Sequence, residues 1–140
     1  MMTATFIVHD LNQAEAALDA ADQSGVPVIL RSALGAAQTI GPGVFMAITE
    51  KARLAHPKTD AVAVLDCGDE AGAALAALRQ GCQDLAINLA PEARSKLEEL
   101  AEKSGARIRG PIVGPVLDLS QTNDPVSASL KFLTPESPNE

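Results

Sequence analysis

A short segment that follows an apolar run carries side chains able to do chemistry. Residues 66–69 are an acid, a thiol, a glycine and a second acid, and they come directly after the run AVAVL at 61–65. A continuous apolar run is typical of a strand buried on both faces of a parallel sheet. Polar residues at the carboxyl end of such a strand lie where α/β proteins place their sites. The sequence therefore predicts a candidate site around Asp66 and Cys67.

Each of these side chains also has a structural interpretation. Asp66 or Asp69 could cap the following helix, because exposed amides at a helix start stabilise acids. Cys67 could be a small buried filler. If it is exposed, its place before a helix start would lower its pKa, which makes it the residue to test by thiol labelling.

His9 and Asp10 form a second polar pair at the end of an apolar run, TATFIVHD at 3–10. Asp10 can cap the helix expected from Leu11, since its carboxylate can accept from amides of the first turn. His9 is either a strand-end imidazole bonded to the backbone or part of a site with Asp66 and Cys67, to which Asp10 could be added.

The elements that position these residues alternate between strand and helix. Glycine and proline residues mark the ends of the helical patterns. The connections between strands are long enough to hold a helix, which indicates parallel strands. Strands are expected at 3–9, 26–32, 61–66, 84–89 and 106–109, with a sixth, short one at 116–119. This (βα)4β pattern predicts an α/β fold with a mostly parallel sheet of about five strands. We expect an open, flavodoxin-like sheet in preference to a half-barrel completed by a second copy.

The domain organisation follows from the same pattern. Residues 1–119 are expected to form a single α/β domain, and 120–140 an irregular C-terminal extension with a mobile end at 134–140. The glycine-rich segment 33–43 is expected to be a loop with one helical turn.

Parallel strands end at one edge of a sheet, so several polar residues should meet there. His9, Ser32, Asp66 and Asn88 are expected on this shared rim. The loop that begins near Gly35 could cradle an anion with its backbone amides. The candidate ligand-binding residues are therefore His9, Asp10, Ser32, Gly35 and Asn88. We interpret Arg31, Arg107 and Arg109 as surface charges, or as contacts for a ligand carboxylate or phosphate.

Composition excludes several classes of partner. The formal net charge is −7, with three Phe and no Trp or Tyr, so the phosphate contacts and stacking platforms of nucleic-acid binding are missing. No apolar tract approaches the roughly 18 to 20 residues that span a bilayer. The first residues do not resemble a signal peptide, so we expect a cytoplasmic protein with two free thiols, no membrane association and no nucleic-acid partner.

Three segments together resemble a known family. They are VPVILRSALGAAQTIG at 26–41, AVAVLDCGD at 61–69 and ALRQGCQDLAIN at 77–88. They are similar to the N-terminal half of class II, zinc-dependent fructose-bisphosphate aldolases and their tagatose-bisphosphate relatives. In that family the second segment carries Leu-Asp-His-Gly. The similarity in order and spacing covers about residues 4–109.

The resemblance implies roles for individual residues. Asp66 would be the catalytic acid that moves a proton at the carbon-carbon bond, and Cys67 stands where the family has a zinc-binding histidine. Ala33 replaces a serine near a substrate phosphate, and Asn88 replaces an acid. Zinc at Cys67 is the metal that the resemblance implies. Otherwise no cofactor is expected, because the family's remaining histidines lie on strands this chain is too short to contain.

These observations support three hypotheses for function. The first is a degenerate aldolase-like module, a pseudoenzyme without a complete metal site, that binds a small ligand, phosphorylated or not, or a protein partner. The second is a metal-dependent aldehyde-lyase whose site is completed by another subunit, for example in a homodimer. The third is a receiver-like signalling domain, because Asp10 and Asp66 follow the first and third strands.

Overall fold

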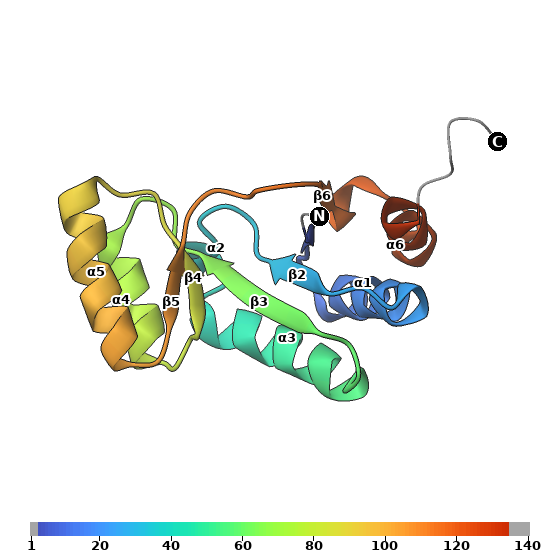
Figure 1. Cartoon of the computed structure of the whole chain (residues 1–140), viewed down its shortest axis with the longest axis horizontal. Helices are drawn as coiled ribbons and strands as arrows, with labels where there is room; N and C mark the ends of the chain where they lie inside the picture. Colours follow the sequence, from blue (N-terminus) through green and yellow to red (C-terminus); the bar gives the residue numbers. More distant parts are fainter. Residues whose placement is uncertain (1–2, 135–140) are drawn as a thin grey trace. The chain divides into compact units, whose positions relative to one another are not determined.

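The computed structural model describes residues 3–134 (Figure 1). Its strands are β1 (Ala4–Ile7), β2 (Val28–Arg31), β3 (Ala61–Asp66), β4 (Asp84–Ala86), β5 (Arg107–Arg109) and β6 (Val116–Asp118). Its helices are α1 (Leu11–Ser24), α2 (Ala36–Thr39), α3 (Pro42–Ala55), α4 (Ala71–Arg79), α5 (Pro91–Lys103) and α6 (Pro125–Leu133), with a 3₁₀ turn η1 (Leu119–Gln121). None of these helices is long and apolar enough to cross a bilayer.

The strands form one open, all-parallel sheet in the order β5-β4-β3-β2-β1-β6. This confirms the predicted α/β class and the preference for an open sheet over a half-barrel. The sheet has six strands where about five were expected, and the sixth is the short strand predicted near 116–119.

Contacts divide the chain into two compact units. Unit 1 comprises the described residues within Met1–Leu30, Ile48–Val62 and Val113–Glu140, and unit 2 comprises Arg31–Ala47 and Ala63–Ile112. The described residues 113–134 thus belong to the same unit as β1 and α1, and the boundary expected at residue 119 stays a prediction. Of the end expected to be mobile, 135–140 lie outside the described residues.

Unit 1 is built on the pairing of β1 with β6 and the packing of α1 on α6 (Figure 1). The register aligns Ile7 with Asp118, so both strands end at the same level. Phe6, fully buried, meets Phe132 of α6 edge to face, with ring centroids 5.4 Å apart. Such aromatic pairs contribute about 0.5–1.5 kcal/mol beyond the area that they bury.

Helix α6 corrects the prediction of an irregular C-terminal segment. Asp124 accepts a hydrogen bond from the backbone N–H of Ser127, and Pro125 occupies the first turn. A capping acid followed by proline is a helix start, because proline needs no donor there. The many Ser, Pro, Asn and Asp residues of this segment concealed that start in the sequence.

Unit 2 contains the parallel pairing of β3 with β4 and of β4 with β5. Helices α4 and α5 pack side by side, and α2 packs against α4 (Figure 1). Helix α4 buries small side chains at Ala74 and Ala77, which allows close helix packing. The single helical turn expected between 33 and 43 is α2, whereas α3 begins at Pro42.

Candidate functional site

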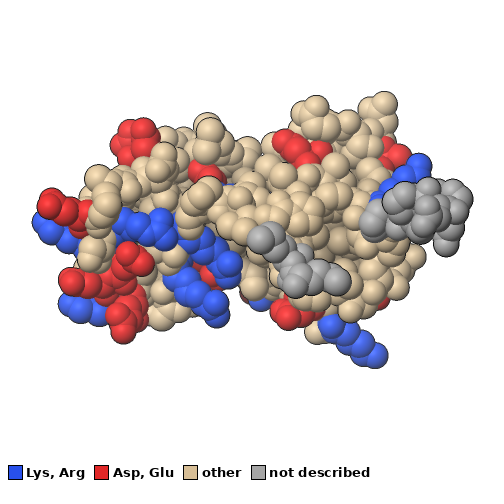
Figure 2. All heavy atoms as spheres, turned by 45° about the horizontal axis from the view of Figure 1, so that its top comes forward, with Lys and Arg blue, Asp and Glu red and all other residues tan. Residues whose placement is uncertain are grey.

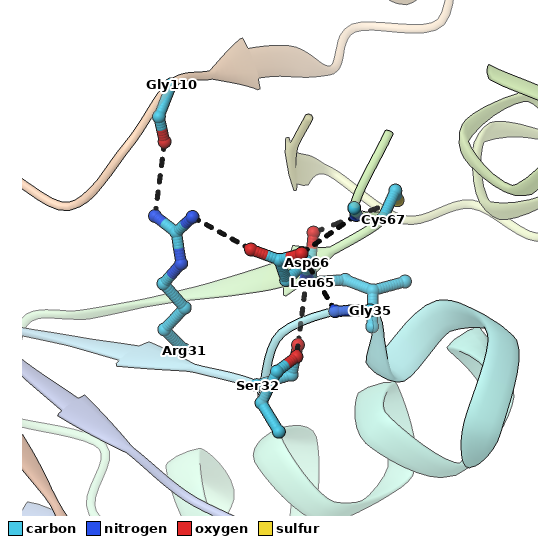
Figure 3. A network of polar contacts seen from close by, with 9 residues as sticks. Arg31, Ser32, Gly35, Leu65, Asp66, Cys67 and Gly110 are labelled. Carbon is cyan, nitrogen blue, oxygen red and sulfur yellow. Dashed lines mark hydrogen bonds and ion pairs between the residues drawn. The ribbon is translucent and has the colours of Figure 1, made fainter. Parts of the chain in front are cut away.

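The centre of unit 2 is the carboxylate of Asp66, whose two oxygens both accept hydrogen bonds (Figure 3). Oδ1 accepts from the backbone N–H of Gly35 at 2.9 Å and of Gly68 at 2.8 Å. Oδ2 accepts from Nη2 of Arg31 at 3.0 Å. The Asp66 side chain is 8% exposed and that of Arg31 11%. A charge this buried requires such partners, because transfer out of water is costly otherwise.

Strand geometry explains this arrangement, since Arg31 and Asp66 are the last residues of β2 and β3. Oγ of the buried Ser32 accepts from the backbone N–H of Asp66 at 2.8 Å and donates to the carbonyl of Ala33 at 3.1 Å. Both of these hydrogen bonds join the Ser32 hydroxyl to backbone atoms of the site itself. Ser32 therefore holds the two strand ends together.

Glycine is required where the two loops turn toward Asp66. Gly35 and Gly68 adopt φ values of 69° and 63°, a left-handed conformation that side chains disfavour. The loops also come close, since a Cβ on Gly68 would lie 3.8 Å from Cα of Gly35. These turns aim both backbone amides at one carboxylate oxygen.

A second cation approaches the same strand ends from α5. Nη1 of Arg31 donates to the carbonyl of Gly110, one residue past β5, at 3.2 Å. Nη1 of Arg94, in the first turns of α5, lies 3.7 Å from the position that a Cβ on Gly110 would occupy. Figure 2 shows basic side chains, among acidic ones, over the part of the molecule that holds α4, α5 and β5.

Asn88 follows β4 and is exposed beside these loops. Its backbone N–H donates to the carbonyl of Gly68 at 2.8 Å, which ties it to the loop after Asp66. Unit 2 thus brings together Ser32, Gly35, Asp66 and Asn88, four of the residues singled out in the sequence. We call the strand-end surface formed by 32–35, 66–70, Asn88, Arg94 and Gly110 the Arg94 rim.

Cys67 is fully buried next to this network. Burial raises the pKa of its thiol to about 12, and unfavourable interactions with Cys82 and Asp66 add to the effect. Zinc binds the thiolate, which this environment opposes. Among residues 3–134, no three His, Cys, Asp or Glu side chains are grouped so that they could hold a metal ion. The donor set around Cys67 therefore does not fit zinc, and its surroundings match those of a small buried filler.

His9 and Asp10 belong to unit 1, where each has partners of its own. Asp10 accepts from the backbone N–H of Gln13 at 2.8 Å and caps α1, as predicted. Nε2 of His9 lies 2.8 Å from Oδ1 of Asp118. The predicted rim shared with Asp66 stays a prediction.

Sequence reasoning did not assign several residues of the site. Arg31 was interpreted as a surface charge or a ligand contact, yet it is buried against Asp66. The sequence held a signal for this pair. Arg31 lies near the end of one apolar run and Asp66 ends the next, so opposite charges follow neighbouring strands. Arg94 and Gly110 gave no comparable signal, because only the tertiary fold brings α5 to the end of β5.

The sequence matches no protein-family model, and a search of curated proteins finds no match.

Proposed function

We propose that the Arg94 rim binds a small anionic ligand of the phosphorylated kind, and that Asp66 positions the site without reacting. The observation that carries this proposal is the approach of a second guanidinium group, that of Arg94, to Gly110, whose carbonyl already binds Arg31. Arginine presents several donors in a planar fork that matches the oxygens of a phosphate.

The rim carries charges of both signs, because its segment 66–70 also contains the exposed acids Asp69 and Glu70. Asp66 balances Arg31, so that pair presents little net charge. The acid described near Arg94 is Glu98, 3.7 Å from its Nε and half exposed. An exposed pair of this kind, spaced i,i+4, contributes only about 0.3–0.5 kcal/mol. Arg94 therefore keeps donors and charge for a ligand.

Two helix starts at the rim supply further donors. Glu70 and Ala90, which precede α4 and α5, make no capping hydrogen bond through their side chains. In unit 1, by contrast, Asp10 and Asp124 cap α1 and α6. First-turn amides that no side chain caps and the helix dipole favour negative charge at such a place, a preference that Glu92 in the first turn of α5 already meets in part.

The aldolase resemblance suggests the chemical kind of ligand. A degenerate aldolase-like module would keep affinity for a sugar phosphate and lack the metal chemistry, and the poor fit of Cys67 to zinc agrees with that hypothesis. The alternatives, a lyase completed by another subunit and a receiver-like domain, stay predictions. Stoichiometric zinc that is lost on Cys67→Ala would favour the lyase, and phosphorylation of Asp66 by acetyl phosphate would favour the receiver.

Calorimetric titration with fructose 1,6-bisphosphate and with inorganic phosphate tests the proposal. We expect Arg94→Gln to weaken binding about 10-fold or more, because a hydrogen bond to a charged group contributes about 1.5–3 kcal/mol. Lys96→Gln is the matched control, since Lys96 is exposed on the same helix and the change in charge is equal. Equal weakening by both variants, or no heat with either ligand, would overturn the proposal.

A further inference from the structure

The ends of β1 and β6 bring a histidine and an aspartate together in unit 1. Asp118 is the last residue of β6 and pairs in register with Ile7, two residues before His9. Nε2 of His9 and Oδ1 of Asp118 are 2.8 Å apart. Both side chains are about one third exposed, at 34% and 32%. The pair is held by the backbone pairing of two strands and is open to solvent.

The surroundings of Asp118 fix which nitrogen of His9 carries the proton. The same Oδ1 accepts from the backbone N–H of Ser120 at 3.0 Å and from its Oγ at 2.8 Å. Burial opposes ionisation of Asp118, but these hydrogen bonds and His9 outweigh it and hold the pKa of the carboxyl below its usual value. An ionised carboxylate can only accept, so Nε2 of His9 must be the donor. In the neutral imidazole Nδ1 is then left with its lone pair.

The main chain of His9 is fixed as well. Its N–H donates to Oε1 of Gln13 at 2.8 Å, while the N–H of Gln13 donates to the capping carboxylate of Asp10. Within residues 3–134, no hydrogen bond to Nδ1 of His9 is found. The imidazole is thus oriented by an acid on one nitrogen and free on the other, which is the arrangement of a general base.

His56, the other histidine, provides an internal comparison. Its Nε2 lies 3.5 Å from Asp19 and its Nδ1 3.4 Å from Asp22, and its side chain is only 11% exposed. Both nitrogens of His56 therefore face carboxylates. Within residues 3–134, His9 alone of the two histidines has a ring nitrogen without an acid contact, and its side chain is one third exposed.

We propose that His9 and Asp118 form a general-base site that activates water toward a neutral electrophile such as an ester. Nδ1 of His9 takes a proton from water as the water oxygen bonds to the ester carbonyl. The imidazolium then gives that proton to the departing alkoxide, so that one ester and one water yield an acid and an alcohol. Asp118 stabilises the imidazolium and stays ionised. The acids Asp10 and Asp118 disfavour an anionic substrate here. The substrate proposed for this site therefore differs in charge from the ligand proposed for the Arg94 rim.

Hydrolysis of p-nitrophenyl acetate, measured together with the His9 tautomer by nitrogen-15 NMR at alkaline pH, tests the inference. We expect His9 as the Nε2–H tautomer, and a protein-dependent rate that is slower in deuterium oxide. His9→Gln should reduce this rate at least about 10-fold, because glutamine can still donate to Asp118 and is not a base. His56→Gln should leave it unchanged.

Asp118→Asn separates catalysis from a merely structural contact. The asparagine oxygen can still accept from Ser120 and from Nε2 of His9, so the tautomer should be kept, while the imidazolium loses its counter-charge and the rate should fall. His9 as the Nδ1–H tautomer in the parent protein would overturn the inference. So would a rate that does not depend on His9, or one that is equal in both solvents.

Discussion

The guanidinium of Arg31 lies 3.0 Å from the carboxylate of Asp66, and the pair joins the last residues of two strands. Both side chains are about nine-tenths buried. Breaking such a pair by removing one partner leaves an uncompensated charge, whereas removing both avoids that penalty. The same two side chains also bind the backbone amides of Gly35 and Gly68 and the carbonyl of Gly110.

Asp66→Asn should lower the free energy of unfolding by about 3–5 kcal/mol, because Arg31 is left buried without a counter-charge. Urea denaturation measures the change. The double variant Arg31→Met, Asp66→Asn should cost less than the sum of the two single variants. Additive losses, or a loss below about 0.5 kcal/mol for Asp66→Asn, would show that the pair is not coupled.

Ser32→Ala should cost about 1–3 kcal/mol, since it leaves the buried N–H of Asp66 without its acceptor. Ser95→Ala is the control, because Ser95 is exposed on α5. Thermal or urea unfolding of both variants gives the comparison. Equal stability of the two variants would contradict the role given to the Ser32 hydroxyl.

The buried thiol of Cys67 makes stability fall in alkali. Its pKa is about 12 in the folded protein against 9.0 ordinarily, so the folded chain holds this proton longer than the unfolded chain. The stability is complete below pH 9 and is lost as the pH rises toward 12. At pH 10 the loss is about 1.4 kcal/mol. Cys67→Ala should lose less between pH 8 and 10, as measured by denaturant titration at each pH.

Alkylation of the Cys67 thiol tests its burial in a second way. A buried, protonated thiol should react with iodoacetamide only when the chain opens, so its labelling in mild denaturant should follow unfolding. Rapid labelling of Cys67 in the native protein would contradict the described burial.

The stability that Asp22 contributes should depend on pH in the opposite direction to that of Cys67. Hydrogen bonds from Thr59 and His56 lower its pKa against a small opposing effect of burial. The resulting stability is present above the usual carboxyl pKa and is lost as the pH falls through the lower folded value. Thr59→Val should therefore raise the pKa of Asp22 in an NMR titration. It should also be less stable than the parent at pH 7, with a difference that shrinks in strong acid. An unchanged Asp22 titration would contradict this prediction.

Local patterns were enough to predict the repeating architecture. The apolar runs, the Asp10 cap and the helix-length connections predicted parallel strands and an open sheet, and they placed polar residues at strand ends. Helix α6 was missed because loop-like composition outweighed the Asp124-Pro125 start. Gly35 and Arg31 lie 31 and 35 positions from Asp66 in the sequence, and Asp118 lies 109 positions from His9. Contacts at such separations are set by strand order, which local periodicity does not encode.

Amide NMR shifts during titration with fructose 1,6-bisphosphate test most directly whether the Arg94 rim is a binding site. We predict that saturable changes concentrate at residues 32–35, 66–72, 88–94 and 110, and that Arg94→Gln removes them while Lys96→Gln does not. Changes confined to other residues, or changes that Arg94→Gln leaves in place, would contradict the proposed site.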